Sequence, residues 1–138
     1  MWDMLSEQRE LIGEPKGENT IRVLVVEPNK APYPLDVPNR LDTFQRLVDG
    51  LIEAVYFEEP GICGYCNDEG KLIGLEANRR FGGDIICGNL VILGSDDEGG
   101  NVSLTDEQIE RYTEMFKEPE VISQDEVRSS LSYEIFTF

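Results

Sequence analysis

Apolar residues in the first third of the chain form one strand-like run and one helical stripe. In residues 21–27 the only charge within the apolar run is Arg22, and three residues are valine, which is typical of a strand buried on both faces. Four prolines between positions 28 and 38 predict a loop without regular period. Asn39 then fits as the capping residue of a helix, and Gly50 is placed to end it at a position that requires positive φ. One face of this helix is apolar: Leu41, Phe44, Leu47, Val48 and Leu51.

The middle of the chain predicts strands separated by turns. Residues 52–57 alternate as a strand does. Residues 62–66 are expected to pair with residues 72–75 across a hairpin turn at 68–71, in which Gly70 takes positive φ. A polar step at 78–80 interrupts the apolar pattern, and a Gly-Gly-Asp turn at 82–84 precedes the most apolar run, residues 85–93. Gly88 and Asn89 within that run predict a bulge or bend.

The last third contains the best-signalled helix. Thr105 and Gln108 form a capping box, Leu104 and Ile109 are spaced as a hydrophobic staple, and Pro119 prevents continuation. Its buried stripe is expected to consist of Ile109, Tyr112 and Phe116.

A second cap, Ser123 with Glu126, predicts a short helix reaching Leu131. Residues 133–138 hold three aromatic residues and an isoleucine, so we expect this tail to be docked on its own sheet or on a partner.

This order of elements predicts an α+β fold, with a mostly antiparallel sheet of about five strands and two main helices packed on it. The length of 138 residues fits one domain. We expect an N-terminal arm at residues 1–20, the α+β domain at residues 21–119, and an extension with a short helix and aromatic tail at residues 120–138.

Composition predicts a cytoplasmic protein. The chain has three cysteines, no signal-peptide pattern and no long apolar run, which indicates a reducing compartment and no membrane association. A net charge of −16 repels nucleic-acid phosphates and anionic lipids, so no direct nucleic-acid binding is expected.

The negative charge is concentrated toward the C-terminal end, where residues from Gly94 onward include twelve acids and three bases. One interpretation is that this charge only keeps the protein soluble. The alternative is that it attracts a basic protein partner or imitates the charge of DNA. The candidate partner-binding residues are Asp96, Asp97, Glu98, Glu107, Glu110 and Glu114.

A polar cluster, Asn78, Arg79, Arg80 and Asp84, lies within the apolar half of the chain. It is interpreted either as a small-ligand or anion site with Arg79 as the planar donor, or as a structural clasp in which an arginine bonds loop carbonyls and Asp84 caps a turn.

Catalytic and metal chemistry find little support in the residue pattern. Cys63 and Cys66 form a C-x-x-C motif, but the chain has no histidine and only Cys87 besides, so a zinc site would need a carboxylate or a second chain. The motif lies in a predicted strand, where cysteines usually pack as small apolar residues. We therefore expect no metal, no cofactor and no catalytic residue.

Several segments together resemble an uncharacterised family, a domain of unknown function, carried by bacteriophages and conjugative elements of gut bacteria. They are the strand at 21–26 with the Glu-Pro-Asn-Lys that follows, and residues 48–53, 67–71, 78–79 and 83–88. The similarity covers about residues 20–117 and implies a genomic setting without a mechanism. The preferred hypothesis is a non-enzymatic accessory protein that binds through its acidic surface; the alternatives are a small-ligand binder centred on Asn78 and Arg79 or, least favoured, an enzyme without histidine.

Overall fold

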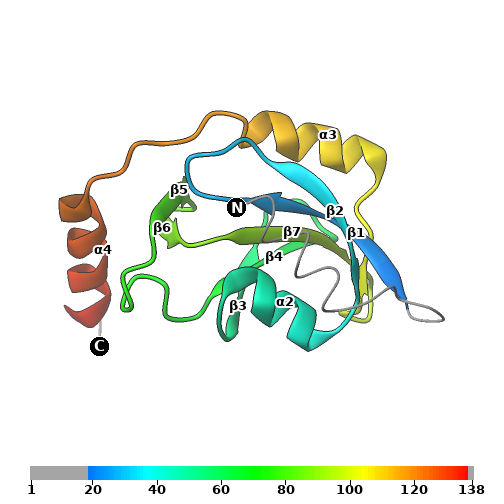
Figure 1. Ribbon diagram of the computed structural model, residues 1–138, viewed down its shortest axis with the longest axis horizontal. Coiled ribbons are helices and arrows are strands. Elements are labelled where there is room, and N and C mark those ends of the chain that lie inside the picture. The colour runs from blue at the N-terminus through cyan, green and yellow to red at the C-terminus, as the bar shows by residue number, and fades with distance from the viewer. Residues whose placement is uncertain (1–18, 137–138) are drawn as a thin grey trace.

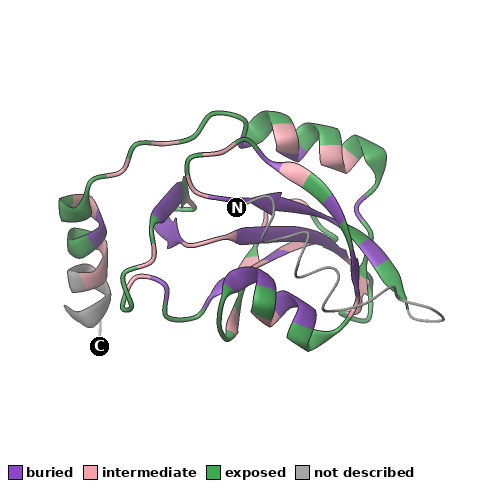
Figure 2. Ribbon diagram, viewed as in Figure 1, coloured by how far each residue is buried: buried purple, intermediate pink, exposed green. Residues whose placement is uncertain are grey.

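The fold is organised around two central strands, β1 (Thr20–Val26) and β7 (Leu90–Ser95), which pair antiparallel. The computed structural model describes residues 19–136, with side chains as far as residue 131. Most of β1 and β7 is buried on both faces, as the β-branched composition of residues 21–27 predicted (Figure 2).

Five strands follow the order β2-β1-β7-β4-β3 in an antiparallel sheet, and β8 pairs with β7 as a sixth. The hairpin of β5 and β6 forms a separate two-stranded sheet. The described helices are α2, α3 and α4, so the predicted α+β fold class is confirmed. The remaining bounds are β2 (Tyr33–Pro38), β3 (Ile52–Tyr56), β4 (Ile62–Asn67), β5 (Ala77–Phe81), β6 (Asp84–Cys87), β8 (Asn101–Val102), α2 (Leu41–Val48), α3 (Asp106–Met115) and α4 (Gln124–Phe136).

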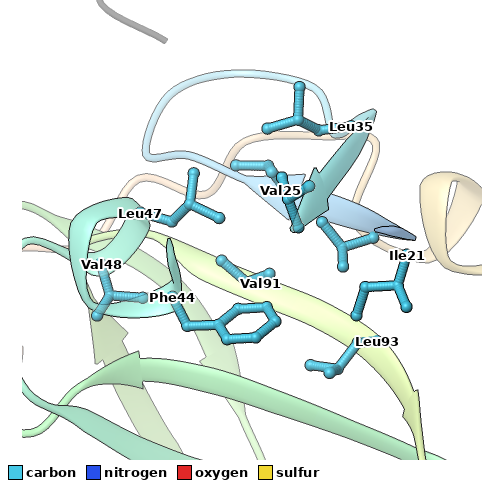
Figure 3. Close-up of a cluster of buried hydrophobic side chains, with 10 residues drawn as sticks. Ile21, Val25, Leu35, Phe44, Leu47, Val48, Val91 and Leu93 are labelled. Atoms are coloured by element: carbon cyan, nitrogen blue, oxygen red, sulfur yellow. The ribbon is translucent and has the colours of Figure 1, made fainter. Parts of the chain in front are cut away.

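The large sheet has a core on each face. Figure 1 shows α2 and α3 on opposite sides of the sheet, with α4 at one end beside β5 and β6. On the first face, Phe44, Leu47 and Val48 of α2 point toward Val91 and Leu93 of β7 (Figure 3). The second face packs against α3 and the β5–β6 hairpin through a cluster of Leu24, Val26, Ile62, Cys66, Ile86, Leu90, Ile92, Leu104, Tyr112 and Phe116.

The proline-rich segment after β1 is a strand, so the expected loop is wrong there. β2 pairs with β1, with Pro34 opposite Leu24 and Pro38 opposite Thr20. An edge strand accepts prolines because one of its sides needs no N–H groups for pairing. The same prolines discourage further strands from adding to this edge.

The expected hairpin between 62–66 and 72–75 is also wrong. β4 pairs instead with β3 and β7, and residues 71–74 form turns in which Leu72 and Ile73 are exposed. Gly70 does not have positive φ; the left-handed glycine of this segment is Gly74, at φ 79°. Three of the four residues 72–75 are apolar, but none of the four belongs to a strand.

Residues 78–80 do not interrupt a strand but belong to β5, which pairs with β6. The turn between them was predicted correctly, with Gly82 at φ 60° and Gly83 at φ 81°. The bend predicted in the run 85–93 is also confirmed, because Gly88 has φ 86° and separates β6 from β7.

The first helix begins differently from the expectation, because its N-cap is Arg40, without a side-chain cap. It ends as predicted at Gly50, which has a positive φ of 157°, although the C-cap before it, Asp49 at φ 62°, is also left-handed. Asn39 instead exchanges hydrogen bonds with Asn101 and joins the start of α2 to β8. Of the predicted apolar stripe, Leu41 and Leu51 are exposed.

The two later helices begin where predicted. Thr105 and Gln108 form the capping box of α3, and Tyr112 and Phe116 are buried. The Ser123 hydroxyl accepts a hydrogen bond from the Glu126 N–H, but α4 continues past Leu131 to Phe136. The side chains of the aromatic tail 133–138, and residues 1–18 of the expected arm, lie outside the described part of the chain. No helix within the described residues is long and apolar enough to span a membrane.

Candidate functional site

Arg79 is a buried arginine that joins three segments of the chain. Its Nη2 donates to the main-chain oxygens of Lys30, at 2.7 Å, and Phe116, at 2.8 Å. Its Nη1 donates to the Asn78 side-chain oxygen at 2.7 Å. The Asn78 amide in turn donates to the oxygens of Val26 and Gly88, both at 2.8 Å. These contacts tie β5 to the end of β1, the following loop and the end of α3.

The buried environment of Arg79 affects the ionisation of its side chain. Burial lowers the pKa of its guanidinium, and the carboxylate of Glu120 opposes that shift. Arginine nevertheless remains protonated in proteins, so the buried group is a cation held mainly by neutral carbonyl oxygens. Its Nε has no hydrogen-bond partner among the described residues. The side-chain N–H groups of Asn78 and Arg79 thus donate mostly to main-chain oxygens. This favours the structural-clasp interpretation. Ligand binding by these two residues stays a prediction.

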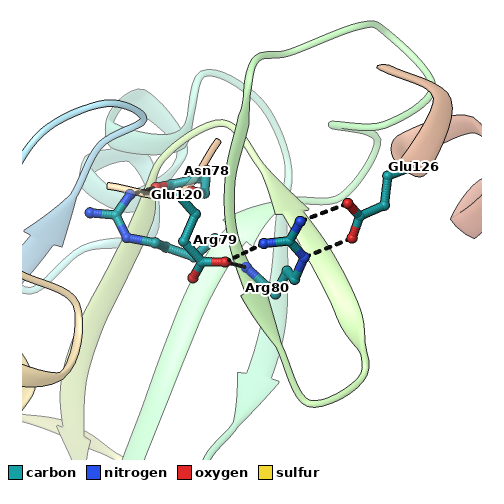
Figure 4. A network of polar contacts seen from close by, with 5 residues as sticks. All are labelled: Asn78, Arg79, Arg80, Glu120 and Glu126. Carbon is teal, nitrogen blue, oxygen red and sulfur yellow. Dashed lines mark hydrogen bonds and ion pairs between the residues drawn. The ribbon is translucent and has the colours of Figure 1, made fainter. Parts of the chain in front are cut away.

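Arg80 faces the opposite way from Arg79, as successive strand residues do (Figure 4). Its guanidinium forms a two-pronged pair with Glu126 of α4, both bonds at 2.7 Å, and also contacts Glu120 at 3.0 Å. The hydrogen bonds that Arg80 donates to these carboxylates raise its pKa, the bonds to Glu126 most. Arg80 therefore attaches α4 to the hairpin.

Asp84 supports the same attachment from β6. Its carboxylate pairs with Lys71 and accepts a hydrogen bond from the Ser130 hydroxyl at 3.0 Å. The main-chain N–H of Ile85, also in β6, donates to it at 2.8 Å. The four residues proposed as one site are consequently divided between an internal clasp and the contact with α4.

The six predicted partner-binding acids occupy two neighbouring segments in the sequence, the β7–β8 loop and α3. All six are exposed. Asp96 stabilises its own loop by accepting hydrogen bonds from the N–H groups of Glu98 and Gly100. Within the part of the chain that the structure describes, none of the six forms an ion pair with a base.

Most bases of the described chain are instead paired with other acids. Arg111, the only base within α3, donates to Glu59 at 2.6 Å, and the Tyr112 hydroxyl donates to the same carboxylate at 2.6 Å. Burial, then the contact with Glu59, raises the pKa of Tyr112 to about 12. This arrangement fixes α3 to the β3–β4 turn and leaves Glu107, Glu110 and Glu114 on the outside of the helix.

The two thiols of the C-x-x-C motif lie on opposite faces of the sheet. Cys63 packs with the first core cluster and Cys66 belongs to the second. This follows from the strand, because residues three apart project from opposite faces. The two thiols therefore cannot ligate one ion together. Burial raises the pKa of both, that of Cys66 to about 11, so neither is an activated thiolate at neutral pH.

A cavity of about 340 Å³ lies between β3, the turn after β4 and the β5–β6 hairpin. Of the residues predicted as site residues, Asp84 alone contributes to its lining. The other lining residues could not be predicted from sequence patterns, because they belong to four segments that only the fold brings together. The polar lining residues are Glu53, Asn67, Asp68, Glu69, Lys71 and Asp84, with the thiols of Cys66 and Cys87.

Comparison with known proteins adds a family and no activity. The model of the DUF3846 family, described as a domain of unknown function, matches residues 21–117. No curated protein and no solved structure matches the chain. The match spans nearly the same residues as the predicted α+β domain and leaves residues from 118 onward, which include α4, outside it.

Proposed function

We propose that this chain, which belongs to the DUF3846 family of domains of unknown function, is a non-enzymatic protein that binds a basic protein partner through its acidic surface. That surface consists of the six exposed carboxylates of the β7–β8 loop and α3, namely Asp96, Asp97, Glu98, Glu107, Glu110 and Glu114. The observation that supports the proposal most directly is that none of the six pairs with a base among the described residues.

Uncompensated charge of this kind has a physical consequence for association. Exposed carboxylates that are not paired with a base extend a negative potential over roughly 10 Å at moderate salt. Such a potential increases the encounter rate with a positively charged surface more than it strengthens the finished complex. Had the acids been paired, as Glu59 is with Arg111, their fields would largely cancel.

The helix that carries three of the acids is suited to presenting them. α3 begins with a complete capping box and is held to the sheet by two buried aromatic residues, Tyr112 and Phe116. Tyr112 packs edge-on against Phe57 with ring centroids 5.4 Å apart. A helix fixed in this way holds its outer carboxylates at defined positions, which reduces the ordering cost of binding.

The biological setting that we propose is an accessory protein of a phage or mobile element. It is supported by the sequence motifs that resemble the family of such elements. A host defence or DNA-handling protein is a suitable partner, because proteins that bind nucleic acid carry basic surfaces that contact phosphates. The acidic surface would then compete for such a basic surface.

The test is capture of partners from a bacterial lysate at low and high salt, followed by rate measurements with the purified partner. The variant replaces Glu107, Glu110 and Glu114 with glutamine, which removes three charges and keeps side-chain size. We expect the association rate constant to fall by about tenfold at low salt, with a smaller change in the dissociation rate constant. The difference between variant and parent should shrink as salt rises.

The matched control replaces Asp49 with asparagine and Glu58 and Glu118 with glutamine, which removes the same charge outside the proposed surface. All three are exposed, and asparagine tolerates the left-handed conformation of Asp49. If the control slows association as much as the α3 variant, net charge alone accounts for binding. If neither variant slows association at any salt concentration, the acidic surface is a solubility feature and the proposal is wrong.

A further inference from the structure

We propose that the cavity between β3, the turn after β4 and the β5–β6 hairpin is a binding site for a small organic ammonium, a positively charged head on an apolar stem. This site shares no residue with the acidic surface of α3, so the inference goes beyond the proposed function and does not depend on it. The volume of about 340 Å³ lies within the range of about 300–1,000 Å³ that is usual for small-molecule sites.

The charge of the lining selects the sign of the ligand. Four carboxylates line the cavity against one ammonium, that of Lys71. Lys71 is held on one side, where it pairs with Asp84 and donates to the Ser130 hydroxyl at 3.0 Å. Asp68 and Glu69, in the turn after β4, have no basic partner among the described residues. A cation is therefore favoured at this side of the cavity and an anion is repelled.

The turn that carries Asp68 and Glu69 is fixed by a buried amide. The Asn67 side chain donates to the main-chain oxygens of Val48, at 3.1 Å, and Asp49, at 3.0 Å, and its oxygen accepts from the Glu69 N–H at 2.7 Å. Gly70 lies so close to the Cys87 main chain that a Cβ would be 2.5 Å from its oxygen. The two carboxylates thus stand on a backbone that is locked to both α2 and β6, as a preorganised site requires.

The rest of the lining is apolar and suits a hydrocarbon stem. Val55, Phe81 and Ile86 line the cavity and also pack with the second core cluster, while Leu131 contributes from α4. Cys66 and Cys87 add neutral, polarizable surface, because burial raises the pKa of each thiol. Apolar walls with a few polar groups that fix orientation are the usual composition of a small-molecule site.

An organic cation fits this lining better than a metal ion. Within the described residues, no three side chains of histidine, cysteine, aspartate or glutamate converge as metal ligands. Carboxylates that are spread around an apolar space instead match a ligand that combines one positive charge with an apolar stem. A free alkylamine and the side chain of a lysine both offer this chemistry.

The test is an NMR titration of the full-length protein with pentylamine, compared with pentanol and pentanoate, which have the same stem with a neutral or negative head. We expect saturable shifts of the Glu69, Gly70 and Ile86 amides with pentylamine and weaker binding of the other two. Replacing Asp68 with asparagine and Glu69 with glutamine together should weaken pentylamine binding by about tenfold, because hydrogen bonds to charged groups are among the strong ones. A parallel titration with N-acetyl-lysine methylamide identifies the source of the cation: tighter binding than pentylamine indicates a protein side chain, and weaker binding a free amine.

The matched control replaces Asp42 with asparagine and Glu118 with glutamine, two exposed acids outside the cavity, and should leave pentylamine affinity unchanged. Equal weakening by control and cavity variants would show that only net charge attracts the amine and would overturn the proposal. Pentanol binding as tightly as pentylamine, or shifts that never saturate, would also overturn it. The variant of Glu107, Glu110 and Glu114 should bind pentylamine as the parent does, so each proposal can fail without the other.

Discussion

The guanidinium Nη2 of Arg79 lies 2.8 Å from the main-chain oxygen of Phe116, and so β5 holds the C-terminal end of α3. The same nitrogen reaches Lys30 on the loop after β1. Both oxygens accept from a side chain that is 1% exposed, in a region that β5, α3 and the loop enclose together. Arg79 thus donates hydrogen bonds to two segments that lie 49 and 37 positions away from it in the sequence.

Replacing Arg79 with methionine should lower the free energy of unfolding by about 3 kcal/mol, because it leaves buried carbonyl oxygens without a donor. Replacement with lysine should also be destabilising, by about 2 kcal/mol, since one ammonium lacks the planar set of donors. Urea unfolding measures both. The exposed Arg46 provides the control, and its replacement with glutamine should change stability by less than about 0.5 kcal/mol. A methionine variant as stable as that control would show that the clasp contributes nothing.

Two glycines should respond in opposite ways to the same substitution. Gly82 has φ 60° with open space around its missing side chain, and it begins a two-glycine turn in which Asn-Gly is preferred. Gly82→Asn should therefore be neutral or slightly stabilising. Gly70→Asn should cost about 1–3 kcal/mol, because its Cβ would lie 2.5 Å from the Cys87 oxygen. Thermal melts compare the two; equal midpoints would contradict the close approach at Gly70.

The sequence predicts correctly those elements that depend only on neighbouring residues. The capping box at Thr105, the glycine turn at 82–83 and the bend at Gly88 all follow from the conformation or hydrogen bonding of a few adjacent residues. Strand pairing is different, because it depends on which edges are available. The apolar stretch nearest to residues 62–66 is 72–75, whereas β4 lies between β3 and β7 in the sheet.

The candidate sites also differ in whether local sequence patterns are enough to predict them. The exposure of the acids on α3 follows from helical periodicity, so Glu107, Glu110 and Glu114 could be placed outside the helix from the sequence. The separation of Arg79 from Arg80 also follows from strand periodicity, but only once residues 77–81 are known to form a strand. The cavity requires the positions of β3, the turn after β4 and the hairpin at once, which no local pattern contains.

Cys63 and Cys66 should not form a disulfide in the folded protein. Residues three apart in an extended strand have Cα atoms about 10 Å apart, beyond the limit of about 7 Å for a disulfide. Mild oxidation of the native protein, then removal of the oxidant, alkylation in urea and peptide mapping by mass spectrometry should find both thiols alkylated. The same oxidation in urea is the control, because the unfolded chain can bring the two sulfurs together. A native peptide that contains the Cys63–Cys66 disulfide would contradict the strand assignment of β4.

The attachment of α4 should weaken in acid. The hydrogen bond from Arg80 lowers the pKa of Glu126 in the folded protein. Burial tends to raise the pKa of Asp84, but hydrogen bonds from Lys71, the Ile85 N–H and Ser130 outweigh it and lower the pKa overall. For a group whose folded pKa is lowered, the stabilisation is complete above the ordinary pKa, about 4 for a carboxylic acid, and is lost as pH falls through the folded value.

Hydrogen exchange should therefore show protection of the Val127 amide, which donates to Ser123, falling below about pH 4 while β7 remains protected. Glu126→Gln removes the charge that Arg80 binds, so it should reduce this protection already at neutral pH and flatten its pH dependence. Asp125→Asn is the matched control, since Asp125 pairs with Arg128 within α4 and contacts no residue of the hairpin through that pair. If protection of α4 and β7 falls together, or if the Asp125 variant behaves like the Glu126 variant, the carboxylates facing the hairpin are not what holds α4.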